Sequence, residues 1–359
     1  MTESLDNLWQ KLAEFDIVSG RRPGILNESA PWYVKLISAA SGWVAAVFFV
    51  TFVGAMLGQI LDNSAVTLVC GAIVLITAHM TLRRNDEGFV THLGLALSLT
   101  GQALIAWVIV RNFSENATLC CALIAAFEFA LVALMPNYLH RIFSTVLALC
   151  FLYVTITFDR DLSAIRFDYY HSLLVALFMF VAASLWFNEL QHRTASAAFE
   201  ASAWGVTITL LIVESFAIFQ PIVEASNALA ANFFGLNPTT ITELLLTAVF
   251  VWVTLKLIDG LSPVSSRVKN AAIAGALVIG LLAVKAPGIG VGMMLILIGH
   301  HHQNLVLKGF GAIALLVYIS RYYYLMDKTL MYKAGVLMAL GLGLLGARML
   351  ILNVARKAQ

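Results

Sequence analysis

Two acidic residues lie inside apolar stretches of the sequence, where a charged side chain is costly. Glu128 is near the middle of the run 117–135, and Glu214 lies deep in the run 197–218. An ionisable side chain at membrane depth commonly binds a proton or a cation, or faces a water-filled path. The alternative is a structural acid that is protonated or hydrogen-bonded to a neighbouring helix. Glu128 is the first candidate for proton or cation binding, and Glu214 is the second.

Other polar residues in the apolar runs are weaker candidates for chemistry. Glu200 and Glu243 lie near the ends of their runs, where a carboxylate can simply reach the membrane interface. Gln102 and His79 are single polar groups, and such groups more often join two helices by a hydrogen bond than bind a ligand.

The patterns that would indicate a metal or a nucleotide cofactor are weak. The histidine run 300–302 is consecutive, but neighbouring side chains on a helix point roughly 100° apart, so a solvated turn is favoured over a metal site. Gly341, Gly343 and Gly346 spell G-x-G-x-x-G inside an apolar run. A dinucleotide fingerprint follows a strand, whereas small residues in a membrane segment let helices approach closely. None of the four cysteines has the spacing of a zinc or redox pair. We expect no metal and no cofactor.

The most unusual group of side chains joins the last two apolar runs. It contains Arg321, Tyr322, Tyr323, Tyr324, Asp327 and Lys333. Asp327 is suited to cap the final helix, and it could form ion pairs with Arg321 and Lys333. This group could attract an anionic headgroup, peptide or solute. It could instead be an aromatic belt with snorkelling cations.

Twelve apolar runs must position all of these residues. They cover 36–58, 65–82, 91–110, 117–135, 138–158, 168–187, 197–218, 240–258, 268–284, 288–301, 306–322 and 330–352. About 20 apolar residues cross the ~30 Å hydrocarbon core, and backbone groups in lipid favour helices. The sequence therefore predicts an all-α, polytopic transmembrane helical bundle of about twelve segments. A Pro-Gly pair separates the ninth and tenth runs. These two runs could instead form a re-entrant hairpin, which would leave ten full spans.

Composition and charge agree with a lipid-facing chain. Hydrophobic residues make up 60% of the sequence and charged residues 12%, against roughly 25% charged in soluble domains. The net charge of +2 gives no argument for nucleic acid. With a cytoplasmic N-terminus, the inner loops and termini hold fifteen Lys and Arg residues and the outer loops seven. The positive-inside rule then predicts both termini in the cytoplasm.

The first 30 residues differ from the rest. Leu5, Leu8 and Leu12 recur at helical spacing among acidic residues, which predicts a short amphipathic helix. Because helices on anionic lipid are usually basic, we expect this one to dock on the cytoplasmic face of the protein or on a partner. Residues 31–359 contain no repeat or linker and are predicted to form a single membrane domain.

The sequence resembles a family of bacterial integral-membrane proteins described as domain of unknown function 4401. The resemblance is carried by Pro31 to Lys35, Gly299-His300 with Asn304 and Leu305, and the run from Arg321 to Lys333 closing on Arg348. It implies an inner-membrane protein without an established activity, often found beside a second uncharacterised membrane family and a protein named for a G-D-Y-x-x-L-x-Y motif. It also implies that the tyrosine-rich run and Arg348 are signature positions, without making them catalytic.

These observations favour a non-enzymatic accessory or scaffold component of the bacterial envelope, held in the inner-membrane bilayer and contacting other membrane or envelope proteins. The alternative is a proton-coupled transporter of a small solute, which the segment number, Glu128, Glu214 and the break at Pro287-Gly288 suggest. A membrane enzyme is the least favoured hypothesis, because the histidines are not assembled with carboxylates at metal-ligand spacing.

Overall fold

A computed structural model describes most of the chain between the first and the last predicted runs. The described residues are 63–83, 89–135, 137–157, 164–189, 196–219, 238–260, 265–284, 288–325 and 329–335, with scattered positions between 14 and 52 and residue 338. The regular structure in these ranges is helical, and they contain no strand. The predicted amphipathic helix of residues 1–30 lies outside the described residues apart from Glu14.

The helices follow the predicted runs closely. They are α3 (Ser64–Leu82), α4 (Phe89–Asn112), α5 (Ala117–Leu134), α6 (Tyr138–Thr157), α7 (Ala164–Glu189), α8 (Ser196–Phe219), α10 (Pro238–Asp259), α11 (Ser266–Ala283), α12 (Ile289–His301) and α13 (Leu305–Leu325). Their bounds lie within four residues of those predicted for the second to eleventh runs. Seven described helices are long and apolar enough to cross a membrane. The prediction of a helical multi-pass membrane protein is confirmed.

Asparagine side chains begin several of the helices. The Asn63 side chain accepts hydrogen bonds from backbone N–H groups at the start of α3, and Asn116 accepts from Leu119 at 2.9 Å in α5. Asn137 and Asn304 do the same for α6 and α13. An N-terminal cap satisfies donors that the helix leaves open, so these short polar stretches set where each apolar helix starts.

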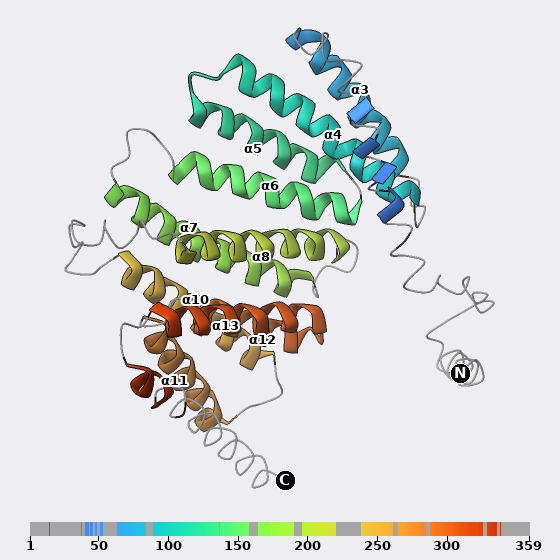
Figure 1. The fold of residues 1–359 in the computed structure, drawn as a ribbon. Helices are drawn as coiled ribbons and strands as arrows, with labels where there is room; N and C mark the ends of the chain where they lie inside the picture. The colour runs from blue at the N-terminus through green and yellow to red at the C-terminus, as the bar shows by residue number, and fades with distance from the viewer. Residues whose placement is uncertain are drawn as a thin grey trace. The chain divides into compact units, whose positions relative to one another are not determined.

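The chain divides into two compact units, Met1–Leu104 and Ile105–Gln359. In the second unit α6 packs against α5, α7 and α8, α7 also packs against α10, and α10 packs against α11 and α12. α12 and α13 form a closely packed hairpin. Figure 1 shows α5, α6 and the α7–α8 pair following one another, with α10, α12 and α13 on the other side of that pair.

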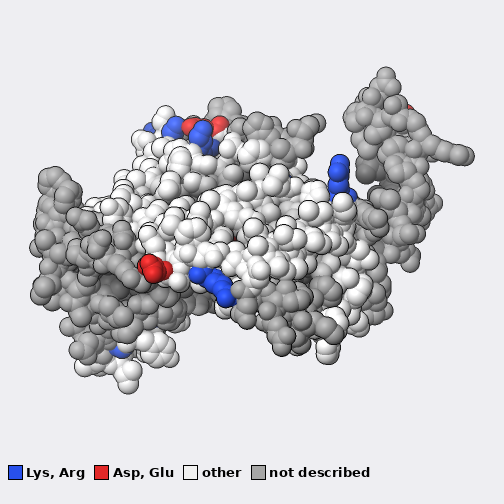
Figure 2. Space-filling model, turned by 90° about the horizontal axis from the view of Figure 1, so that it is seen from above, with Lys and Arg blue, Asp and Glu red and all other residues white. Residues whose placement is uncertain are grey.

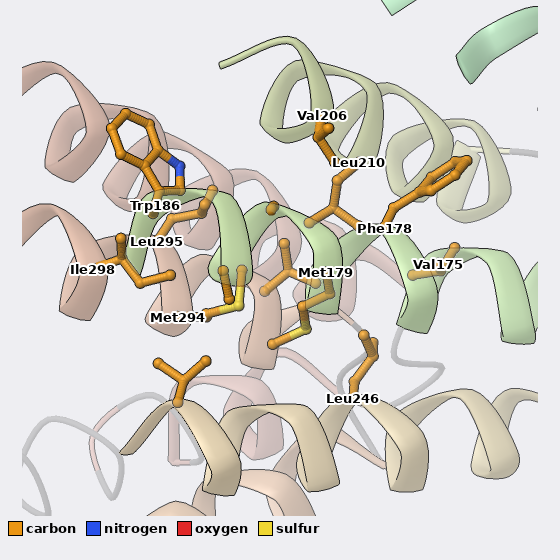
Figure 3. Packing of buried hydrophobic residues seen from close by; sticks show 14 of the residues in the cluster. Val175, Phe178, Met179, Trp186, Val206, Leu210, Leu246, Met294, Leu295 and Ile298 are labelled. Atoms are coloured by element: carbon orange, nitrogen blue, oxygen red, sulfur yellow. The ribbon is translucent and has the colours of Figure 1, made fainter. Parts of the chain in front are cut away.

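The core of the second unit is a layer of apolar side chains shared by α7, α8, α10 and α12. Met179, Leu210, Leu246 and Met294 are fully buried there, and Figure 3 shows them meeting between the helices. Trp186 closes one end of the layer, where its indole N–H donates to Thr207 at 3.2 Å. This packing fixes α8, α10 and α12, which carry three of the four residues of the site described below.

Large apolar side chains are exposed along the described helices. Examples are Leu134 on α5, Leu281 on α11 and Leu316 on α13. Figure 2 shows a broad uncharged surface on which described Lys, Arg, Asp and Glu residues are few and scattered. Such a surface is unfavourable in water and is expected for helices that face lipid.

An arginine in the first turn of α6 is hydrogen-bonded to the C-terminal end of α5. The Arg141 guanidinium on α6 donates to the carbonyl oxygens of Val132 at 3.0 Å and Met135 at 3.2 Å, at the end of α5. Cations stabilise helix C-termini, where carbonyl groups lack intrahelical partners. We expect Arg141→Gln to lower the free energy of unfolding by about 1.5 kcal/mol, measured by thermal denaturation in detergent. Arg267→Gln, at an exposed position in the first turn of α11, is the control.

A candidate intramembrane carboxyl site

Glu243 meets the start of α12 inside the helical bundle. It lies in the second turn of α10, and its Oε1 accepts a hydrogen bond of 3.2 Å from the backbone N–H of Gly288. Gly288 is the N-cap of α12 and provides no side chain to cap the helix. The carboxyl group of Glu243 therefore satisfies one of the donors that the helix start leaves open, and it lies at the positive end of the helix dipole.

Glu214 and Tyr318 complete the group. Glu214 of α8 and Tyr318 of α13 lie close enough to Glu243 for their charges to interact, and Ser215 lies beside the Tyr318 hydroxyl. Glu214, Glu243 and Tyr318 expose only 3%, 1% and 2% of their surfaces. Four helices thus bring two carboxyl groups, a phenol and a helix start together. We call Glu214, Glu243, Gly288 and Tyr318 the carboxyl site.

Gly288 shapes this site through its backbone. Its φ of +90° is in the left-handed region, which glycine adopts without strain. A Cβ atom at this position would lie 2.7 Å from the Tyr318 ring. Glycine therefore allows the chain to turn into α12 directly under that ring. Of the neighbouring glycines, Gly292 packs against α13 and Gly290 has open space where a Cβ would lie.

Further polar side chains lie on the adjoining turns of α6, α7 and α10. The Tyr153 hydroxyl and His171 Nδ1 are 3.0 Å apart. Ser172 of α7 is hydrogen-bonded to Thr242 of α10, which directly precedes Glu243. The end of the bundle that contains the carboxyl site is therefore richer in buried polar groups than its core of Met and Leu side chains.

Glu128, the first candidate from the sequence, lies elsewhere. It is buried on α5, and its carboxyl group lies beside Ser144 of α6. Its Oε2 has no hydrogen bond. The acid that lies near Glu214 is Glu243 and not Glu128. Glu243 was the weaker candidate in the sequence because it lies near the end of an apolar run. Glu200 accepts a hydrogen bond from the Tyr138 hydroxyl at 3.0 Å, which is a structural contact between α6 and α8.

Two side chains of the histidine run pack against aromatic side chains. The His302 ring contacts Trp186 at 5.4 Å between centroids, and His301 contacts Phe187 at 6.1 Å. Within the described residues no group of three or more His, Cys, Asp and Glu side chains could hold a metal ion. The run forms the end of α12 and the turn into α13.

His302 gives this turn a pH dependence. Burial, together with the neighbouring His301, lowers the pKa of His302 from 6.5 to about 4. Between these values the unfolded chain binds a proton that the folded chain does not, so stability is lost as pH falls from 6.5 towards 4. We expect the Tm of His302→Phe to fall by about 2–4 °C less than that of the wild type across this window. His300→Phe, at an exposed neighbouring position, should behave like the wild type in the same scanning measurement.

The tyrosine-rich group is described in part. Lys333 Nζ lies 5.2 Å from the centroid of the Tyr323 ring, and Tyr323 contacts Tyr324 edge to face. Asp327, Arg348 and the Tyr322 side chain lie outside the described residues, as do the glycines at 341, 343 and 346. The described helix 330–335, which contains Lys333, begins directly after Thr329, whose Oγ1 accepts from the Tyr332 N–H at 3.4 Å. Arg321 is described at the last turns of α13.

One feature of the sequence, besides Glu214 itself, points to the position of the carboxyl site. A Pro-Gly pair at 287–288 interrupts two apolar runs, and helix breaks of this kind place backbone donors at membrane depth. A carboxylate elsewhere in the chain can satisfy those donors. The pairing of Gly288 with Glu243, 45 positions apart, depends on the packing of α10 against α12.

Comparison with known sequences agrees with the resemblance noted from the motifs. Residues 31–354 match the family described as domain of unknown function (DUF4401). No curated protein matches the chain, and no solved structure matches it either. Because the match covers nearly the whole chain, this multi-pass membrane protein belongs to the DUF4401 family.

Proposed function

We propose that this protein is a proton-coupled transporter of a small solute, and that Glu214 and Glu243 carry the proton. The observation that supports this proposal is a buried carboxyl group, Glu243, hydrogen-bonded at the N-terminus of α12 and close enough to the buried Glu214 for their charges to interact. A buried carboxylate pair in hydrocarbon needs protons, a cation or donors to offset its charge. The Gly288 N–H offsets part of that charge, and binding of a proton can neutralise the remainder.

The short length of α12 supports the same proposal. Its 13 residues span about 20 Å, less than the ~30 Å of the hydrocarbon core. Transporters commonly place the end of such a discontinuous helix at their binding site, where its dipole acts on bound charges. α12 also contacts α7, α10, α11 and α13. A small movement of α12 would therefore change its packing against all four helices.

The proposal includes a membrane topology of about twelve segments with both termini in the cytoplasm of a bacterial inner membrane. In that topology the carboxyl site lies towards the outer ends of α8, α10 and α12, within reach of protons from outside. We expect a C-terminal GFP fusion to fluoresce and a C-terminal alkaline phosphatase fusion to be inactive. The reverse pattern would refute a cytoplasmic C-terminus.

Reconstituted vesicles provide the functional test. Under an imposed pH gradient, wild-type proteoliposomes should give solute-dependent proton currents with at least one member of a panel of amino acids, sugars and organic ions. Glu214→Gln and Glu243→Gln should each lower them at least tenfold. Glu115→Gln is the matched control, because Glu115 is exposed in the turn between α4 and α5. Currents that persist in both site variants would refute the proposal.

An accessory or scaffold role in the envelope is the second candidate function. It is favoured by exposed apolar and aromatic side chains around the end of α13 and the helix that follows: Tyr324, Leu330 and Met331 expose 79%, 75% and 88% of their surfaces. A photo-crosslinking amino acid at position 331 should then capture a defined membrane or envelope protein in native membranes. Products with lipid alone would contradict this role. We propose no enzymatic activity for either function.

A further inference from the structure

Three buried oxygen atoms of the carboxyl site make no hydrogen bond. They are Glu214 Oε2, Glu243 Oε2 and the Tyr318 hydroxyl oxygen. Their residues are at least 97% buried, and they come from α8, α10 and α13. Buried polar atoms are almost always satisfied by protein, water or a ligand. A group of three unsatisfied oxygen atoms therefore indicates that something else binds among them.

The charge of the site selects the kind of ligand. Two carboxyl groups give it up to two negative charges, and the Gly288 N–H is already used by Glu243 Oε1. An anion would be repelled by both carboxylates. A cation would be attracted to both carboxylates, and all three oxygen atoms could coordinate it.

The ligand types point to an alkali cation. Carboxylate and phenol oxygen atoms are hard ligands, whereas zinc and copper sites use His and Cys. Calcium requires six to eight oxygen ligands, and magnesium retains several waters in octahedral geometry, which three oxygen atoms from well-packed helices do not supply. Na⁺ is a hard monovalent cation that loses its hydration shell more readily than the divalent ions, so it is the cation that we assign to this site.

We propose that the carboxyl site binds Na⁺ in competition with protons, through Glu214, Glu243 and the Tyr318 hydroxyl. This inference rests on the proposed transport function and names the ion that the proton exchanges with. When both carboxyl groups are protonated, the site is neutral and does not hold the cation. Loss of two protons to one side of the membrane leaves two negative charges, and one Na⁺ then binds between them.

Binding can be measured on the full-length protein in detergent. In NaCl at pH 8 the Tm should rise saturably above its value in choline chloride of equal ionic strength, because a ligand that binds the folded state stabilises it. A tenfold increase in proton concentration should weaken the apparent Na⁺ affinity by up to tenfold for each proton displaced. Glu214→Gln, Glu243→Gln and Tyr318→Phe should each weaken it at least tenfold, and Glu115→Gln should leave it unchanged.

Transport distinguishes this inference from the proposed function. Proteoliposomes with an acidic interior should take up ²²Na⁺, and uptake should be lost in Glu243→Gln. If Na⁺ has no effect on Tm while solute-linked proton currents continue in choline medium, the sodium inference is overturned and the proton-coupled function stands. If K⁺ replaces Na⁺ at equal concentration in both assays, the assignment to Na⁺ is overturned. If both acid variants retain proton currents, the inference and the proposed function fail together.

Discussion

Replacing Gly311 with alanine should destabilise the α12–α13 hairpin. A Cβ atom at Gly311 would lie 2.8 Å from the carbonyl oxygen of Gly292 and 2.9 Å from the backbone N of Ile296. These are backbone atoms, so relief requires the two helices to separate. Overpacking of this kind costs about 1–3 kcal/mol, and Gly311→Leu should prevent the hairpin from forming. The expected result is a lower Tm in detergent for the alanine variant and loss of folded protein for the leucine variant.

Gly309 provides a matched control on the same helix. A Cβ atom there meets nothing within 4 Å, and alanine favours the helical conformation by up to about 1 kcal/mol over glycine. Gly309→Ala should therefore match or exceed the wild-type Tm. The pair Gly292→Ala and Gly290→Ala repeats the comparison on α12, where only the first position faces Leu315 and Gly311. Equal effects at 309 and 311 would contradict close backbone packing as the cause.

The helices could be predicted from the sequence because their cause is local. An apolar run of 18 to 26 residues between polar stretches specifies a membrane helix, and an asparagine such as Asn116 or Asn304 fixes its first turn. Even α12, whose run was too short to identify as a span, begins within one residue of its predicted start at 288. Hydrophobicity and capping depend on residues close together in the chain, so the helix positions can be predicted from this sequence alone.

The candidate site could be predicted only in part because its cause is not local. Glu214 was identified by its depth in an apolar run, but its partners depend on which helices become neighbours. Glu243 and Gly288 are joined by the packing of α10 on α12, and Tyr318 is added by the α12–α13 hairpin. No periodicity or spacing in the sequence specifies those contacts. Glu128 had the stronger local signal, yet it lies beside Ser144 at the α5–α6 contact.

Glu243 should have two roles that substitutions can separate. Glutamine at this position retains an oxygen that can accept the hydrogen bond from Gly288 N–H but cannot release a proton. Glu243→Gln should therefore keep the wild-type Tm in detergent while lowering proton-linked flux in vesicles at least tenfold. Leucine removes the acceptor as well and leaves a buried N–H without a partner, which costs about 1–3 kcal/mol. Glu243→Leu should lose both flux and stability.

The combination with Glu214 tests whether the two acids act as one unit. If a proton or cation is shared between them, Glu214→Gln alone should already remove most of the flux, and the double variant should lose little more, because coupled residues are not additive. Independent acids would give fold-losses that multiply. A flux that survives Glu243→Gln but not Glu243→Leu would show that the hydrogen bond to Gly288 matters and the proton does not. Glu243 would then be a capping residue of α12, and the carboxyl site would be structural.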